Sequence, residues 1–324
     1  MRILLVILTA TAGVLALTSC KQTPKQENTT PIAKTTPEVE IVADRFADIQ
    51  MLRYTIPGFE ELSLQQKQLA YYLYMAGMSG RDIFYDQKNR YNLQIRKTIE
   101  TILETYQGDK NEDNYKKFVV YAKRFFFSNG IHHHYSTDKM IPEFDPAFLD
   151  TLISKSDFNK MPNEGKNIEE YIAFLIPILF DPKIDAKGVS LAADADNVKA
   201  SSSNLYEGVT QNEVEQFYKS KIQPGVKEQP SWGLNSKVVK INGKVEEQVW
   251  KSGGMYGAAI DKIIYWLEKA VTVAENDAQK ATLEALVKFY KTGNLKDYDD
   301  YCVLWVKDTA SRIDIANGFI EVYL

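Results

Sequence analysis

Helix-start signals constrain the fold of this 324-residue chain more than any other feature of its sequence. Pairs in which a Ser, Asn or Thr is followed three residues later by Gln or Glu stand at Ser63–Gln66, Asn167–Glu170 and Thr210–Glu213. Such a pair can bond two backbone N–H groups at the start of a helix, an arrangement called a capping box. Apolar residues at helical spacing follow the boxes, so these signals predict a mainly helical protein.

The clearest strand signal is a hairpin in the second half of the chain. Leu234–Ile241 and Lys244–Trp250 are rich in β-forming residues and flank Asn242-Gly243, which accepts the positive φ angles of a type I′ turn. Apolar periodicity predicts further helices at residues 92–106, 111–127, 256–275, 277–290 and 295–307, and a short one after Asp145-Pro146. The sequence therefore predicts an α+β protein, mainly α-helical with a small antiparallel β core.

The N-terminus indicates export. An apolar run, Ile3–Leu17, is shorter than the roughly 20 residues that span a membrane, and it ends in Leu-Thr-Ser-Cys20. This ending is similar to the lipobox of bacterial lipoproteins, whose Cys is lipidated; the alternative is a chance Cys near an ordinary cleavage site. We expect an exported protein of the cell envelope or periplasm, anchored to a membrane by its lipid. Residues 1–19 would be the signal peptide, residues 20–41 the lipidated Cys20 with a flexible tether, and residues 42–324 the folded part.

Charge, cysteine content and missing motifs exclude several functions. The formal net charge is −4 with both signs interspersed, so the chain has no cationic face for nucleic acid. The second cysteine, Cys302, lies in an apolar run, which indicates a buried small side chain and no intramolecular disulfide. The sequence contains no glycine-rich nucleotide loop and no G-x-S-x-G motif.

All three histidines of the chain are adjacent, at His132, His133 and His134. In an extended segment only His132 and His134 share a face, which gives two metal ligands where zinc usually takes three or four. Asp138 could add one more. The alternative interpretations are a segment that lines a binding cleft and a loop of ordinary polar residues.

The C-terminal residues alternate like a strand from Ile313 onward, so Ile313, Ile315, Phe319, Glu321 and Tyr323 are predicted to share one face. Glu321 and Tyr323 would then project side by side, a carboxylate next to a phenol. Without further information, the simpler interpretation is two surface residues on a half-buried strand. Such a pair suits the ammonium group of a peptide N-terminus, because a charge-assisted hydrogen bond is stronger than a neutral one.

Several separated blocks resemble the dipeptidyl peptidase III family of zinc peptidases. They include W-V-K-D from Trp305 followed by N-G-F-I-E-V-Y from Asn317, the segment from Gly233 through W-K-S-G-G-M-Y, and Ser128-Asn129-Gly130 with Tyr135 and Asp138-Lys139. The resemblance implies a fold like the family's substrate-binding lobe. It also implies that Glu321 and Tyr323 hold the substrate peptide and that His134 and Tyr135 line the cleft, which we favour over metal binding.

The family binds zinc through H-E-x-x-G-H and a later Glu, and releases dipeptides from peptide N-termini. This sequence has no His followed by Glu, so we expect no catalytic residue, no zinc bound by this chain and no activity of the chain alone. The expectation is a truncated family member that keeps a peptide-binding surface. The alternatives are a non-catalytic peptide-binding lipoprotein and half of a split enzyme whose separate C-terminal part carries the zinc.

Overall fold

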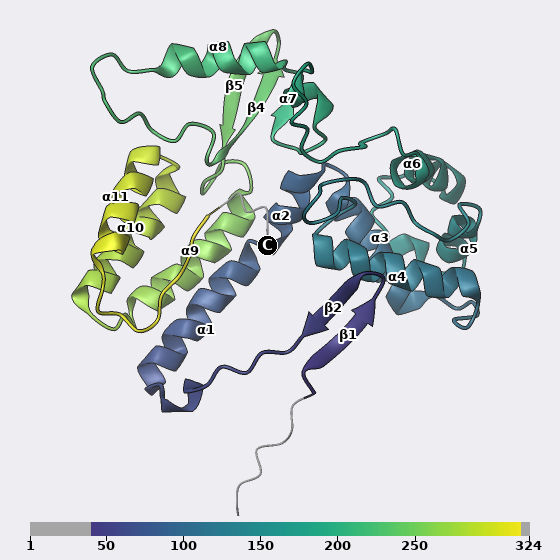
Figure 1. The fold of residues 1–324 in the computed structure, drawn as a ribbon, viewed down its shortest axis with the longest axis horizontal. Coiled ribbons are helices and arrows are strands. Elements are labelled where there is room, and N and C mark those ends of the chain that lie inside the picture. The colour runs from purple at the N-terminus through teal and green to yellow at the C-terminus, as the bar shows by residue number, and fades with distance from the viewer. Residues whose placement is uncertain (1–39, 319–324) are drawn as a thin grey trace, which may run out of the picture. The chain divides into compact units, whose positions relative to one another are not determined.

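The computed structural model describes residues 40–318, and its elements are mainly helices with two small sheets (Figure 1). The α+β class predicted from the sequence is confirmed. In the part of the chain that is described, no helix is long and apolar enough to cross a membrane.

Four consecutive helices form the first helical group: α3 (Asn92–Thr105), α4 (Asp113–Ser128), α5 (Phe148–Ser154) and α6 (Ile168–Phe180). Ile95, Ile99 and Ile102 of α3 are all buried in the core of this group. Stacked and edge-on aromatic rings fill much of the rest, such as Tyr106 against Tyr115 at 4.9 Å between ring centres. Each fully buried apolar side chain stabilises the fold by about 1.5–3 kcal/mol.

The second helical group consists of α1 (Leu64–Ser79), α9 (Gly257–Val271), α10 (Asp277–Thr292) and α11 (Leu295–Lys307). The predicted capping box starts α1: the Ser63 hydroxyl accepts from Gln66 N at 3.2 Å, and Gln66 Oε1 accepts from Ser63 N at 3.0 Å. Cys302 on α11 is half-buried against this core, and burial raises the pKa of its thiol. Gly293 ends α10 in the left-handed conformation.

A short helix that the sequence did not predict, α2 (Arg81–Lys88), joins the two groups. Its Tyr85 is buried in the core of the first group and its Ile83 in the core of the second. A hydrogen bond of 2.5 Å from the Tyr256 hydroxyl to Asp86 Oδ2 ties α2 to the start of α9. Helix α2 therefore carries side chains to both groups within two turns.

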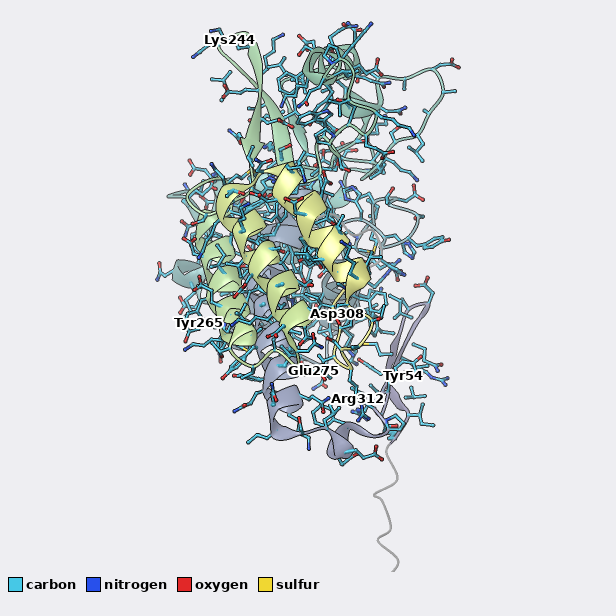
Figure 2. The ribbon with its side chains drawn as sticks, turned by 90° about the vertical axis from the view of Figure 1, so that its left-hand side faces the viewer. Tyr54, Lys244, Tyr265, Glu275, Asp308 and Arg312 are labelled. Carbon is cyan, nitrogen blue, oxygen red and sulfur yellow. The ribbon has the colours of Figure 1, made fainter. Side chains whose placement is uncertain are left out.

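The hairpin has the predicted turn. Strands β4 (Ser236–Ile241) and β5 (Lys244–Val249) pair antiparallel around Asn242 and Gly243, whose φ angles are 50° and 80°. Lys244 lies at its tip (Figure 2). Strand β3 (Tyr206–Glu207) pairs with β4 in parallel, and the capped helix α8 (Gln211–Lys221) packs on this sheet through Val214.

The remaining elements are short. Strands β1 (Val42–Phe46) and β2 (Ile49–Leu52) form a separate antiparallel pair that an ion pair from Asp44 to Lys123 holds against α4. Further turns of helix are η1 (Phe59–Glu61), η2 (Phe158–Lys160) and α7 (Asn197–Ala200).

Candidate functional site

The segment of residues 308–318, which follows α11, contradicts one prediction. The sequence predicts a strand from Ile313 onward, but within the described residues this segment pairs with no strand. The alternation itself is present: Ile313, Ile315 and Asn317 are half-buried, and the residues between them are exposed. An extended chain lying on helices is buried on one side only, and this gives the same period of two as a sheet.

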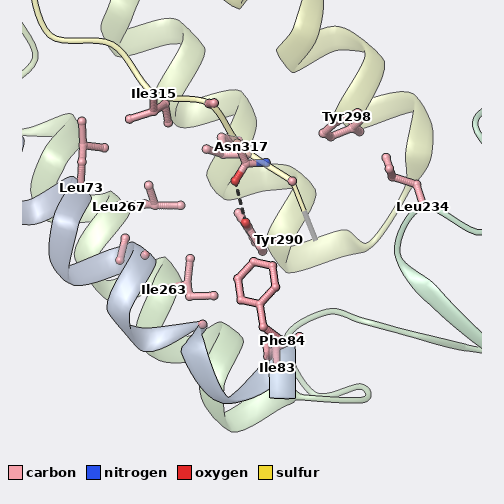
Figure 3. Close-up of a pocket in the computed structure, with 16 residues that line it drawn as sticks. Leu73, Ile83, Phe84, Leu234, Ile263, Leu267, Tyr290, Tyr298, Ile315 and Asn317 are labelled. Atoms are coloured by element: carbon pink, nitrogen blue, oxygen red, sulfur yellow. Dashed lines mark hydrogen bonds between the residues drawn. The ribbon is translucent and has the colours of Figure 1, made fainter. Parts of the chain in front are cut away.

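Side chains at and near α10 form the hydrogen bonds to the backbone of this segment that a neighbouring strand would otherwise form. Ile313 N donates to Glu275 Oε1 at 2.7 Å, and Gln279 Nε2 donates to the Ile313 carbonyl at 2.7 Å. Glu275 also accepts from Arg312 N at 3.0 Å, and the two residues lie together in Figure 2. Further along, the Tyr290 hydroxyl donates to Asn317 Oδ1 at 2.7 Å (Figure 3). Hydrogen bonds therefore hold the segment at residues 312–313 and again at residue 317.

A cavity of about 470 Å³ lies between this segment and helices α1, α2, α9 and α10. Most of its wall is apolar, with Leu73, Ile263 and Leu267 facing Ile315 across it (Figure 3). Gly318, the last described residue, is part of the wall. The predicted site residues Glu321 and Tyr323, and the predicted lipidation site Cys20, lie outside the described residues.

The loop that carries the three histidines is held by Asn92 of α3. Asn129 ends α4 in the left-handed conformation, and Gly130 follows with a φ of 146°. Asn92 Oδ1 accepts from Ile131 N at 3.1 Å, and Asn92 Nδ2 donates to the Tyr85 carbonyl at 3.0 Å. A Cβ atom on Gly130 would lie 2.1 Å from Asn92 Nδ2, so this close approach requires glycine.

His132 is 5% exposed, and its hydrogen bonds fix its tautomer. Its Nε2 lies 2.7 Å from the Asp185 carbonyl and 3.1 Å from the Ser202 hydroxyl, and that hydroxyl donates to the Lys187 carbonyl. Both contacts therefore need a proton on Nε2. Burial lowers the pKa of His132, so at neutral pH the ring is uncharged and Nδ1 carries a lone pair.

The other two histidines lie on the outer part of the loop. His133 Nδ1 accepts from the backbone N–H of Tyr135 and of Ser136, at 3.2 and 3.1 Å. The His134 ring packs edge-on against Phe127 at 4.8 Å, and burial lowers its pKa. Within residues 40–318, no three His, Cys, Asp or Glu side chains come together in a way that could hold a metal ion.

All three histidines line a second cavity, of about 100 Å³, beside α2. The predicted cleft residue His134 is part of this wall, whereas Tyr135 is 71% exposed and is not among the wall residues. Helix α2 contributes Phe84, Gln87 and Lys88 to the wall, and none of these was predicted as a site residue. Their spacing of three and four residues places the three side chains on one face of a helix, and this spacing is the sequence signal from which a shared site could have been predicted.

Phe84 lines both cavities. The cavity under residues 315–318 and the cavity beside His132–His134 are therefore neighbours across one aromatic side chain of α2. Two segments that are distant in the sequence, 183 residues apart between His132 and Ile315 by their numbering, therefore lie on the two sides of one short helix.

Comparisons with known proteins agree on one family. The sequence model of peptidase family M49 matches residues 184–324. Dipeptidyl peptidase 3 of Homo sapiens is 22% identical over 240 residues, and that of Dictyostelium discoideum is 21% identical over 234 residues. Among solved structures, DPP III from Caldithrix abyssi has a TM-score of 0.48 and 14% identity, and the match covers 78% of this chain and 35% of that one.

The matches with the two curated relatives cover 65% and 66% of this chain, but only 32% and 31% of the relatives themselves. The chain thus spans about a third of the length of the relatives it matches. Within that limit, the family match and the matched relatives show that this chain is related to the dipeptidyl peptidase III family, peptidase family M49.

Proposed function

We propose that this chain supplies a peptide-binding surface of the dipeptidyl peptidase III type. One observation carries the proposal: Phe84 lines both the cavity under residues 315–318 and the cavity beside the histidine loop. An extended peptide could place side chains in both cavities at once. Its N-terminal ammonium would then be held by Glu321 and Tyr323, the pair that the family resemblance assigns to this role.

The proposal gives the described residues a role in binding and none in bond cleavage. The family's zinc motif has no counterpart in this sequence, so the catalytic zinc of a complete enzyme would come from residues outside it. Zinc-activated water would supply the nucleophile there. A truncated enzyme, a free-standing peptide-binding lipoprotein and one half of a split enzyme all fit a binding surface of this kind.

The test is calorimetric titration of the full chain with an unblocked pentapeptide and with its N-acetylated form. We expect the unblocked peptide to bind at least about tenfold more tightly, because a hydrogen bond to a charged group contributes about 1.5–3 kcal/mol. Glu321→Gln should remove that difference, and Glu284→Gln, at an exposed position of α10, should preserve it. Equal binding of both peptides would contradict the assignment of Glu321.

The same samples separate binding from catalysis. With added zinc and a dipeptidyl-naphthylamide substrate, we expect no turnover by the chain alone. Turnover that a chelator abolishes would show a zinc centre in this chain and would contradict a binding-only role. Turnover that requires a second polypeptide would instead favour the split enzyme.

We also propose that the protein is exported and anchored to a membrane through lipid on Cys20. In cells labelled with a fatty acid analogue, the wild-type protein should carry the label and partition into the detergent phase. Cys20→Ala should lose both properties, while Cys302→Ala should keep them. A labelled Cys20→Ala protein would exclude this anchor.

A further inference from the structure

Three residues that line the cavity beside the histidine loop each have a buried polar atom without a hydrogen-bond partner in the described part of the chain: Gln87, His132 and His134. Among the residues that the structure describes, neither Gln87 Nε2 nor His132 Nδ1 makes a hydrogen bond, although Gln87 is only 6% exposed and His132 only 5%. An unsatisfied buried group of this kind costs about 1–3 kcal/mol. Three such atoms on the wall of one cavity therefore indicate that the cavity takes a ligand with matching groups.

Gln87 and His132 are the most deeply buried of the three residues, and their unpartnered atoms need opposite kinds of hydrogen-bond partner. Gln87 Nε2 is an amide nitrogen and can only donate. His132 Nδ1 carries a lone pair, because the Asp185 carbonyl and the Ser202 hydroxyl both require the ring proton on Nε2, and it can only accept. The ligand must therefore bring one acceptor for Gln87 and one donor for His132.

Charged groups fit this wall poorly. A carboxylate would satisfy Gln87 and would be attracted by the Lys88 side chain, but it would turn a lone pair toward His132 Nδ1. An ammonium would meet the Lys88 side chain, which lines the same cavity, and would offer Gln87 no acceptor. A neutral group with a donor and an acceptor side by side satisfies both atoms.

We propose that this cavity is a binding site for a carboxamide group. A primary carboxamide carries a carbonyl for Gln87 and an N–H for His132 on adjacent atoms. The volume of about 100 Å³ exceeds what a single water needs, and the apolar wall residues Phe84, Val189 and Leu205 suit the short carbon chain behind the amide.

In a bound peptide, the carboxamide would be the side chain of Asn or Gln, and this form of the inference rests on the proposed function. The cavity itself can be tested without a peptide. If propionamide binds and the pentapeptide does not, the carboxamide site stands and the peptide proposal fails. If the pentapeptide binds and propionamide does not, the peptide proposal stands and the carboxamide site fails.

The experiment is a titration of the full chain, labelled with ¹⁵N-histidine, with propionamide, propionate and 1-propanol. The chain has only three histidines, so His132 can be assigned by its loss in His132→Gln. We expect propionamide to shift the His132 Nδ1 resonance with a Kd on the order of 1 mM, as suits a ligand of five non-hydrogen atoms. Propionate and propanol should leave the resonance unchanged at the same concentrations.

Gln87→Met tests the donor, and Gln94→Met is its matched control. Gln87→Met should weaken propionamide about tenfold and leave the thermal midpoint unchanged or higher, because it removes a buried donor that has no partner within residues 40–318. Gln94 Nε2 donates to the Pro162 carbonyl at 2.8 Å, so Gln94→Met should lower the midpoint without affecting binding.

Three results would overturn the proposal. An equal shift with propionate or propanol would mean that the cavity does not select a carboxamide. No shift with any of the three compounds would mean that it holds water only. A Gln87→Met protein that is less stable but binds propionamide normally would make Gln87 a structural residue.

Discussion

The buried side chain of His132 makes the stability of the fold depend on pH. Burial holds its pKa below the usual value of about 6.5, so below pH 6.5 the unfolded chain binds a proton that the folded chain resists. The contribution of His132 to stability is therefore complete above pH 6.5 and is lost as pH falls toward its folded pKa. The pKa of His134 is shifted in the same direction.

The prediction is that urea midpoints of the wild type fall between pH 7.5 and 5.5, and that His132→Gln flattens part of this fall. His133→Gln is the control, because the ring of His133 lies on the outer part of the loop, where its Nδ1 accepts from two backbone N–H groups. The same slope in the wild type and in His132→Gln would show that His132 does not cause the acid sensitivity.

At the scale of elements, the junction between α4 and the histidine loop depends on Gly130. Gly130→Ala should lower the free energy of unfolding by about 2 kcal/mol or more, because the new Cβ would meet Asn92 and the φ of 146° disfavours any other residue. Gly165→Ala is the control: its φ is 81°, but nothing lies within 4 Å of its Cβ position. Chemical denaturation of both variants separates the clash from the backbone strain; equal losses would argue against the Asn92 contact.

Local signals in the sequence predicted some of these elements and not others. Capping boxes and the Asn-Gly turn are local, so the starts of α1, α6 and α8 and the hairpin turn were predictable. Helix α2 was missed because its N-cap is Gly80, which makes no side-chain cap. The alternation from Ile313 onward predicted a strand, because a chain paired in a sheet and an extended chain packed on helices show the same period of two in burial. Only tertiary packing distinguishes the two. The pairing of Phe84 and Gln87 with the histidine loop depends on the same packing.

In the whole molecule, we infer that residues 311–318 and the histidine loop act as one peptide-binding surface on the two sides of α2. Hydrogen exchange of the full chain, with and without a saturating unblocked pentapeptide, tests this most directly. We predict slower exchange in both residues 130–139 and residues 311–318, with α5 and α6 unchanged. Protection of only one of the two segments, or of neither while the peptide is bound, would contradict the claim.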